Sequence, residues 1–203
     1  MLRKTHITVG AAAGGLYAVA TGEPLLLVAA GICGGALGGA ISDVDSDSSP
    51  THGLAVKAVS AGMVLAAAAA VLEQRYGVTI SGYLKSQDRL LEILLGVILF
   101  SAICLYGINT PHRSFMHSFV ACILLRCTVQ LILPSAAMAF TVGFLSHLAL
   151  DVITKQGIQL LWPMDKRFRL GLCKAGNSAV NGFLCYGSIL VAVGCIAARI
   201  LKL

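Results

Sequence analysis

The chain has 203 residues, a length that suits one domain, and we treat residues 1–203 as a single membrane-embedded unit. Hydrophobic residues make up 57% of it and charged residues only 12%, with a mean hydropathy of +0.85. This composition is typical of a polytopic membrane protein and excludes an ordinary soluble domain. The formal net charge of +6 does not indicate nucleic-acid binding, because no basic run is interleaved with aromatic residues; it fits loops that face anionic lipid.

Hydropathy divides the chain into apolar segments, and a helix of about 20 such residues crosses a bilayer. The sequence therefore predicts an all-α polytopic integral membrane bundle of about six or seven transmembrane or partly spanning helices. The expected segments are 6–21, 24–42, 53–72, 90–108, 115–133, 135–154 and 180–201. The first is short and glycine-rich, so it would be the partial span. It also imitates a signal peptide, but we expect it to be retained, because cleavage after Ala20 would remove His6.

The second expected span carries glycines at positions 31, 34, 35, 38 and 39, in overlapping small-xxx-small spacings. Such a surface lets helix backbones approach closely. We expect it to pack helices around a compact intramembrane site, and the same surface would allow an oligomer. The seven cysteines form no C-x-x-C pair and lie mostly in apolar stretches, so we expect small buried hydrophobic residues rather than disulfides or metal ligands.

Ionisable residues within apolar segments are costly in a membrane and mark functional sites. His147 and Asp151 lie four residues apart in the sixth expected span, so a helix would place both on one face. Imidazole nitrogen and carboxylate oxygen both suit zinc and its neighbours. The alternative is a buried His–Asp hydrogen bond that serves helix packing alone.

Further polar residues are expected at the same membrane face. Successive spans alternate in direction, so the start of an odd span and the end of an even span lie on one side. The residues that this rule brings together are His6, Asp43, Asp45, His112, Arg113, His117, His147 and Asp151. Taken singly they have simpler roles as loop caps, interfacial histidines or a basic anchor. Together they predict a site for one or two divalent ions, Zn²⁺ first and Mg²⁺ or Mn²⁺ as alternatives, with Arg113 holding a phosphate oxygen.

Several segments in this order resemble a known family. They are Thr5-His6, the Asp43-Val-Asp45 pair with Ser48 after it, PHRSFMHS at 111–118, GFLSHLALDVIT at 143–154, Gly157, LLWP at 160–163 and RFR at 167–169. Together they resemble the YdjM family of inner-membrane, predicted metal-dependent hydrolases of bacteria and archaea, and the likeness runs from Thr5 to about Arg169.

That family is grouped with zinc-dependent phospholipase C and P1-type nucleases, so the resemblance implies phosphoester hydrolysis. Carried over position by position, it implies that the metal ligands are His6, Asp43, Asp45, His117, His147 and Asp151. His112 becomes either a further ligand or the acid that protonates the leaving group. Ser46 stands where a histidine often follows the aspartate pair, and Pro111, Ser114 and Met116 also depart from the usual pattern. Both departures spare the candidate ligands but leave the full ligand set of a second ion open.

We therefore expect a membrane-bound hydrolase of the phospholipase C or phosphatase type, acting on a phosphoester of a lipid or amphiphile. Asp45 or Asp151 would lie between two ions, and His112, Arg113 and Asp45 would be catalytic. The alternative is a metal-binding transporter, or a non-catalytic metal-dependent membrane protein. A transporter would want polar residues continuing to the opposite face, where Arg126 and Gln130 are the main ones.

Loop charge predicts the orientation in the inner membrane. The side of the site holds nine Lys and Arg residues and the other side five, with Arg126 between them. The positive-inside rule then places the N-terminus and the site in the cytoplasm and the C-terminus outside. The cytoplasmic segment after residue 154 also combines Trp162 with Lys166, Arg167, Arg169 and Lys174, a pattern typical of a membrane-surface belt.

Overall fold

The structure is a computed structural model of the chain, and it describes residues 1–46 and 88–201. The expected span 53–72 therefore lies outside the described residues. The helices of the described part are α1 Arg3–Ala20, α2 Leu25–Ile41, η1 Ser42–Asp45, α4 Asp88–Ile108, η2 Phe115–His117, α5 Phe119–Ile132, α6 Pro134–Ile153 and α7 Ser178–Ile200. Here η1 and η2 are short 3-10 helices. The predicted all-α fold is confirmed.

Three of these segments are long and apolar enough to cross a membrane, namely Leu25–Asp45, Pro134–Ile153 and Ser178–Ile200. The apolar stretches Glu92–Ile108 and Phe119–Ile132 are shorter. Lengths and hydropathy therefore agree with a helical membrane protein.

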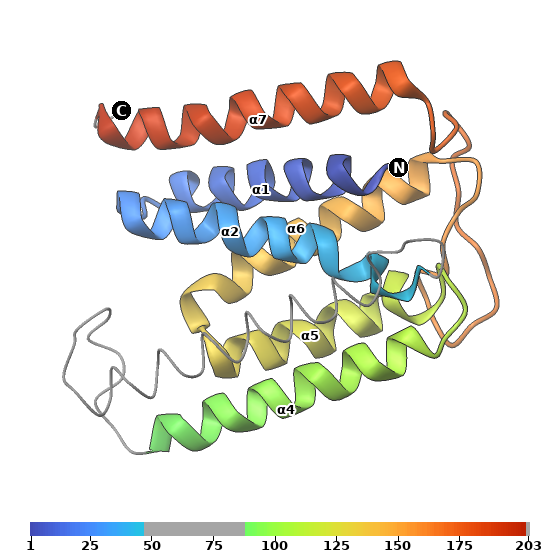
Figure 1. The fold of residues 1–203 in the computed structure, drawn as a ribbon, viewed down its shortest axis with the longest axis horizontal. Helices are drawn as coiled ribbons and strands as arrows, with labels where there is room; N and C mark the ends of the chain where they lie inside the picture. Colours follow the sequence, from blue (N-terminus) through green and yellow to red (C-terminus); the bar gives the residue numbers. More distant parts are fainter. Residues whose placement is uncertain (47–87, 202–203) are drawn as a thin grey trace.

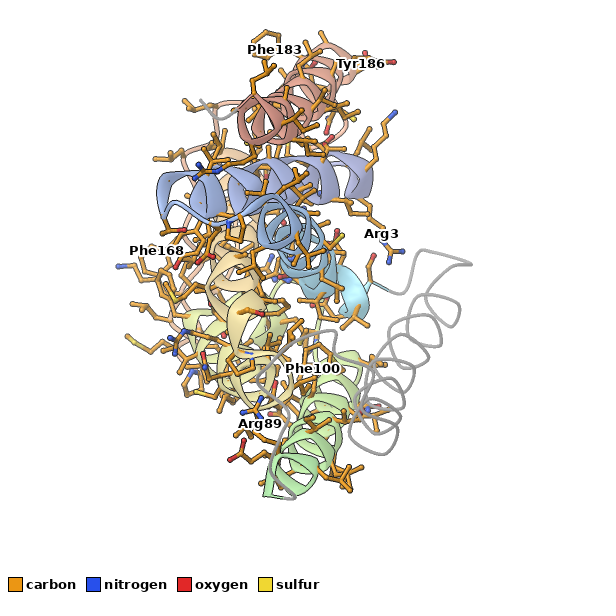
Figure 2. All side chains as sticks on the ribbon, turned by 90° about the vertical axis from the view of Figure 1, so that its left-hand side faces the viewer. Arg3, Arg89, Phe100, Phe168, Phe183 and Tyr186 are labelled. Atoms are coloured by element: carbon orange, nitrogen blue, oxygen red, sulfur yellow. The ribbon has the colours of Figure 1, made fainter. Side chains whose placement is uncertain are left out.

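The helices form a layered bundle with α6 near its centre (Figure 1). Helix α1 packs between α7 and α2, α2 packs against α6, and α5 joins α6 to α4. The core between α4, α5 and α6 is apolar, with Phe100, Leu125, Phe140 and Phe144 almost fully buried. On the outer side of the bundle, Phe183 and Tyr186 of α7 point away from the other helices (Figure 2).

Glycines bring the backbones of α1, α2 and α6 into direct contact. A Cβ atom on Gly35 would overlap the carbonyl oxygen of Gly10 on α1, and one on Gly143 of α6 would overlap the carbonyl oxygen of Gly35. The close packing predicted for the glycine-rich helix is therefore realised within one chain. These glycines face α1 and α6 of the same chain.

Helix α5 begins later than the sequence predicts. The expected span started at residue 115, but Phe115–His117 form the 3-10 turn η2 and α5 starts at Phe119. The side chain of Ser118 accepts a hydrogen bond from the backbone N–H of Ala121, so it caps α5 and ends the turn. As a result, His117 lies before the helix rather than on its face.

The cysteines form no disulfide, as predicted, and all seven lie in the described part of the chain. The expected burial is confirmed for Cys104, Cys122 and Cys195 and is wrong for Cys33 and Cys127, which are exposed on apolar helices. The predicted belt residue Trp162 is half-buried, and its ring packs edge-on against Phe115 and near Tyr106.

Candidate metal centre

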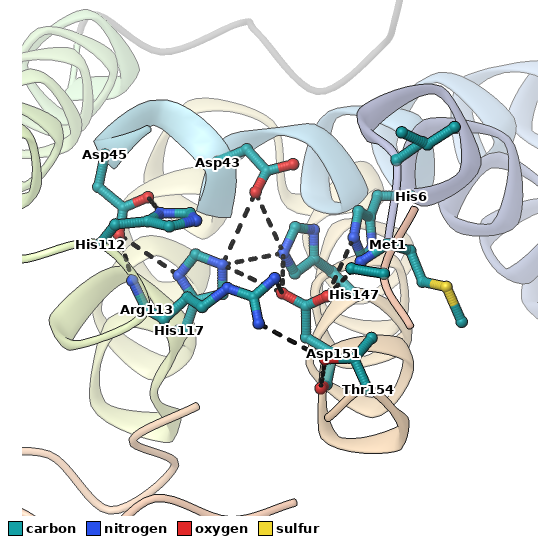
Figure 3. Close-up of polar contacts among 12 residues, drawn as sticks. Met1, His6, Asp43, Asp45, His112, Arg113, His117, His147, Asp151 and Thr154 are labelled. Atoms are coloured by element: carbon teal, nitrogen blue, oxygen red, sulfur yellow. Dashed lines mark hydrogen bonds and ion pairs between the residues drawn. The ribbon is translucent and has the colours of Figure 1, made fainter. Parts of the chain in front are cut away.

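All the residues predicted to converge do so at one end of the bundle (Figure 3). His6 comes from the first turns of α1, Asp43 and Asp45 from η1, and His147 and Asp151 from the last turns of α6. His112, Arg113 and His117 come from the connection between α4 and α5. The alternation of helix direction is the reason, because it brings these ends to the same side of the bundle.

Four ligand atoms surround one point in this cluster. The Nε2 atoms of His117 and His147 are 3.2 Å apart. Asp43 Oδ1 lies 3.7 Å from each of them, and Asp151 Oδ2 lies 3.5 Å from His117 Nε2 and 3.7 Å from His147 Nε2. Zinc at 2.0–2.1 Å from four ligands implies ligand–ligand distances of roughly 3.3 Å. The distances between the two nitrogens, and from each nitrogen to the two oxygens, therefore suit an ion held by these imidazoles and carboxylates.

The tautomer of His147 is fixed by the backbone of α2. Its Nδ1 atom lies 2.8 Å from the carbonyl oxygen of Gly39, which can only accept, so Nδ1 carries the proton. The lone pair of Nε2 then points at the centre of the cluster. Histidines that bind metals usually donate their other ring N–H in this way, and the contact fixes the orientation of the ring.

Asp151 connects this point to a second group of atoms. Its Oδ2 faces His117 and His147, whereas its Oδ1 lies 3.3 Å from His6 Nε2 and 2.7 Å from the amino group of Met1. The His6 ring stacks on the His147 ring and is buried, and neither of its nitrogens makes a hydrogen bond. Buried polar atoms without partners are rare in native proteins, and a second ion between His6 and Asp151 would satisfy one of them.

Asp45 contacts several residues of the α4–α5 connection. Its Oδ1 accepts a hydrogen bond from Nδ1 of His112 at 2.8 Å, and its Oδ2 accepts one from the Arg113 backbone N–H at 3.2 Å. The same Oδ2 lies 3.4 Å from His117 Nδ1. Asp45 thus faces Nδ1 of His117, while Nε2 of the same ring faces His147, Asp43 and Asp151. Of the two carboxylates expected to bridge ions, the geometry favours Asp151, and Asp45 is placed to orient His112 and His117.

Arg113 has a left-handed backbone conformation, with φ of +67°. This conformation is costly for a residue other than glycine, and it lets the Arg113 N–H reach Asp45 while its carbonyl accepts from the Gln159 N–H at 3.1 Å. The guanidinium then lies over the cluster, 3.7 Å from Asp151 Oδ2 and 3.5 Å from the hydroxyl of Thr154.

The cluster is buried and rich in carboxylates. The side chains of Asp45 and Asp151 are at most 2% exposed, and the imidazole of His117 between them is fully buried. Burial alone would lower the pKa of His117, but the facing carboxylates of Asp151, Asp43 and Asp45 outweigh it and raise the pKa well above its ordinary value. The carboxylates of Asp45 and Asp151 are buried and that of Asp43 is partly buried, with the Arg113 guanidinium and the Met1 amino group as cationic neighbours of Asp151. Buried charges of this kind are normally paired or bound to metal.

Several groups in or beside the cluster were given no role from sequence, among them the Met1 amino group that lies 2.7 Å from Asp151. No sequence pattern marks the carbonyl of Gly39 or the hydroxyl of Thr154 as part of a site, because their contacts depend on which helix packs beside them. Asn181 could have been noticed in the sequence, since it is a polar amide within the apolar helix α7. Its Oδ1 accepts hydrogen bonds from the Leu2 N–H at 2.9 Å and the Thr5 hydroxyl at 2.8 Å, one residue before His6.

Comparison with known proteins agrees with this arrangement of motifs. A family model described as the YdjM inner membrane protein matches residues 1–201. The chain belongs to the YdjM family. The inner membrane protein YdjM of Escherichia coli K12 is 36% identical over 83 residues, which cover 36% of this chain and 42% of the relative. Inner membrane protein YdjM of Shigella flexneri matches to the same extent. No solved structure matches.

Membership of the YdjM family agrees with the resemblance carried by the histidine and aspartate motifs. The two YdjM relatives are named for their place in the inner membrane, which fits the apolar helices of this chain. The match spans less than half the length of these YdjM proteins, and their names state no reaction.

Proposed function

We propose that this protein is a membrane-bound, metal-dependent hydrolase that cleaves a phosphoester of a lipid or amphiphile. The observation that carries the proposal is that His117 Nε2 and His147 Nε2 lie 3.2 Å from each other and 3.5–3.7 Å from both Asp43 Oδ1 and Asp151 Oδ2, beside the guanidinium of Arg113. A metal site next to a cation suited to phosphate is the arrangement that phosphoryl chemistry requires.

The fit of the residues to a divalent ion rests on their chemistry. Two imidazoles and two carboxylates suit Zn²⁺, with Mn²⁺ or Mg²⁺ as alternatives, and His6 with Asp151 Oδ1 would hold a second ion. When bound, such ions supply Lewis acidity, which activates water and offsets charge on phosphoryl oxygens. Asp151 would join the two sites, since its two oxygens face different histidines.

The remaining groups handle the substrate. The side chain of His112 is 39% exposed and that of Asp43 is 15% exposed, so substrate would enter on their side of the cluster. Asp45 holds His112 through Nδ1 and leaves Nε2 to give a proton to the leaving alkoxide. The guanidinium of Arg113 would bind a non-bridging phosphate oxygen by charge-assisted hydrogen bonds.

The packing beyond the cluster favours a hydrolase over a transporter. An ion that crossed the membrane from this site would have to pass between α1, α2 and α6. There the backbones of Gly10, Gly35 and Gly143 are in direct contact, which leaves little room for an ion. A site that is open at one end suits catalysis at the membrane surface.

The test is metal analysis of the purified protein followed by hydrolysis assays on phospholipids and other lipid phosphoesters. The variant Asp151→Asn keeps the side-chain volume but loses the anionic oxygen. It should lose stoichiometric metal and all metal-dependent hydrolysis while still inserting and purifying. The matched control Asp165→Asn alters an exposed carboxylate that accepts from Gln159, and it should keep both.

A purely structural His–Asp cluster predicts a different result. Removing one buried partner would then cost roughly 1–3 kcal/mol of stability. If the Asp151→Asn protein is destabilised but keeps stoichiometric metal, the metal site proposed here is wrong. If metal binds but is carried across proteoliposome membranes without hydrolysis, the transporter is the correct function.

A further inference from the structure

The connection between α6 and α7 carries an unusual mixture of exposed side chains. Its large apolar residues Leu161, Met164, Leu170 and Leu172 are 45%, 58%, 65% and 74% exposed. Among them stand the exposed cations Lys155, Lys166, Arg167, Arg169 and Lys174. Asp165 is the one acidic residue between positions 155 and 177, and it accepts a hydrogen bond from Gln159. We call residues 155–174 the basic platform.

The backbone of this connection is ordered, so the exposure of its leucines is built in. Ile158 and Phe168 exchange backbone hydrogen bonds of 3.1 and 2.8 Å. The Leu170 N–H donates to the Val152 carbonyl at 2.7 Å, and the Leu172 N–H to the Ile153 carbonyl at 2.9 Å. These bonds tie the platform to the last turn of α6 and hold Leu170 and Leu172 outward.

The position of the platform in the chain indicates that a lipid surface covers it. Helices α6 and α7, which flank it, are both long and apolar enough to cross a membrane, so the segment between them lies at a membrane surface. Exposed leucines interleaved with Lys and Arg match the boundary between headgroups and acyl chains, where apolar side chains enter and cations meet phosphates. A net charge of +4 on residues 155–177 (five cations less one acid) selects anionic lipid.

The platform is joined directly to the metal centre. The Gln159 N–H donates to the Arg113 carbonyl at 3.1 Å, and the Phe119 N–H donates to the Leu160 carbonyl at 3.0 Å. Trp162 packs on Phe115, two residues from His117. A lipid bound on the platform is therefore held beside the segment that carries His112 and Arg113.

We infer that the basic platform binds anionic phospholipids of the surrounding leaflet and holds their phosphate next to Arg113. The binding of anionic lipid stands on the platform alone. Delivery to the centre rests on the proposed function, and it makes a phospholipid of the same membrane the substrate class.

Trp162 permits a direct test, because it is the one tryptophan of the chain. The full-length protein is placed in phosphatidylcholine vesicles that contain equal mole fractions of brominated phosphatidylglycerol or brominated phosphatidylcholine, and Trp162 quenching is compared. We expect brominated phosphatidylglycerol to quench more strongly. The preference should shrink by roughly fivefold for each cation removed in Lys166→Gln/Arg167→Gln, and also at high salt.

The matched control is Arg89→Gln/Arg126→Gln, which lowers the charge equally on α4 and α5, away from the platform, and should keep the preference. Equal quenching by both lipids, or equal loss in the control, overturns the inference. Absence of quenching by either lipid would also overturn it and would indicate that protein, such as a second copy, covers the platform. An anionic preference in a protein that binds no metal and cleaves no lipid would support the platform and refute the proposed function.

Discussion

Arg113 serves the centre through its backbone and its side chain in different ways. Its backbone N–H and carbonyl connect Asp45 to Gln159 in a left-handed conformation, whereas its guanidinium lies beside Asp151 and Thr154. A single substitution at this position normally changes both contributions. Glycine separates them, because it adopts positive φ without steric cost.

Replacing Arg113 by Gly and by Ala should therefore give two different proteins. Both should bind inorganic phosphate at the metal-loaded centre at least about tenfold more weakly, since a charge-assisted pair is lost. Arg113→Gly should be about 1 kcal/mol more stable than Arg113→Ala, because alanine keeps the strained φ. Phosphate titration and thermal unfolding in detergent measure the two effects. Unchanged phosphate affinity in both variants would rule out Arg113 as the phosphate ligand.

Helix α2 can pack closely against α1 and α6 only because it has glycine at the contact positions. Gly35 faces Gly10 on one side and Gly143 on the other, so a methyl group at this position would overlap the backbone of a neighbouring helix. Gly187 on α7 is also within a helix, but a Cβ atom added there would meet no atom within 4 Å.

Gly35→Ala should destabilise the protein by roughly 1–3 kcal/mol or more, because α1 or α6 must move away. Gly187→Ala should be neutral or stabilising by up to about 1 kcal/mol, since alanine favours helix and fills open space. Thermal unfolding of the two variants in the same detergent makes the comparison. A well-tolerated Gly35→Ala would show that α1, α2 and α6 do not pack as closely as described.

Helix α7 contacts the start of α1, next to the candidate metal centre, through Asn181. The Asn181 amide donates to the carbonyls of Ala175 at 2.9 Å and Asn177 at 2.7 Å, so its Oδ1 is held toward Leu2 and Thr5. These bonds fix the first turn of α1, on which His6 stands. The role of Asn181 is to position His6, and it does not touch the cluster itself.

Asn181→Leu should lower the affinity for the metal by roughly tenfold, the usual cost of losing a group that orients a ligand. In a His6→Ala background the same substitution should have no further effect, because its action passes through His6. Ser188→Ala on the same helix removes only a bond to Leu184 and should bind metal normally. Full additivity of the two changes would contradict the link between Asn181 and His6, and an unaffected His6→Ala protein would remove His6 from the ligands.

At the scale of the whole molecule, the described helices place the centre and the basic platform at the same end (Figure 1). The spans expected from sequence assign nine Lys and Arg residues to that side and five to the other, which predicts that this end is cytoplasmic and that the C-terminus is outside. A reporter fused to the C-terminus that is active only outside the cytoplasm should be active. A cytoplasm-only reporter at the same position serves as the control, and activity there would overturn the predicted orientation.

Much of this arrangement follows from local sequence properties. Hydropathy is a property of consecutive residues, so it predicts the helices on both sides of the undescribed segment to within a few residues. The alternation of helix direction then brings His6, Asp43, His147 and Asp151 to one end without any knowledge of packing. Even the glycines of α2 show a close helix contact before its partner is known. The candidate ligand set was therefore predictable from the order of polar residues along the chain.

Only the tertiary structure decided which atoms of this set face one another. The sequence gives no reason to treat Asp43 and Asp45 differently. In the structure, Asp43 faces Nε2 of His117, whereas Asp45 contacts His112 and Nδ1 of His117. The partner of His147, the Gly39 carbonyl, is a backbone atom on another helix that sequence cannot single out. Such choices depend on the distance and rotation between packed helices, to which residues far apart in the chain contribute. The helical repeat determines on which face of its own helix a side chain lies. The packing of the helices determines which residues of other helices that side chain contacts.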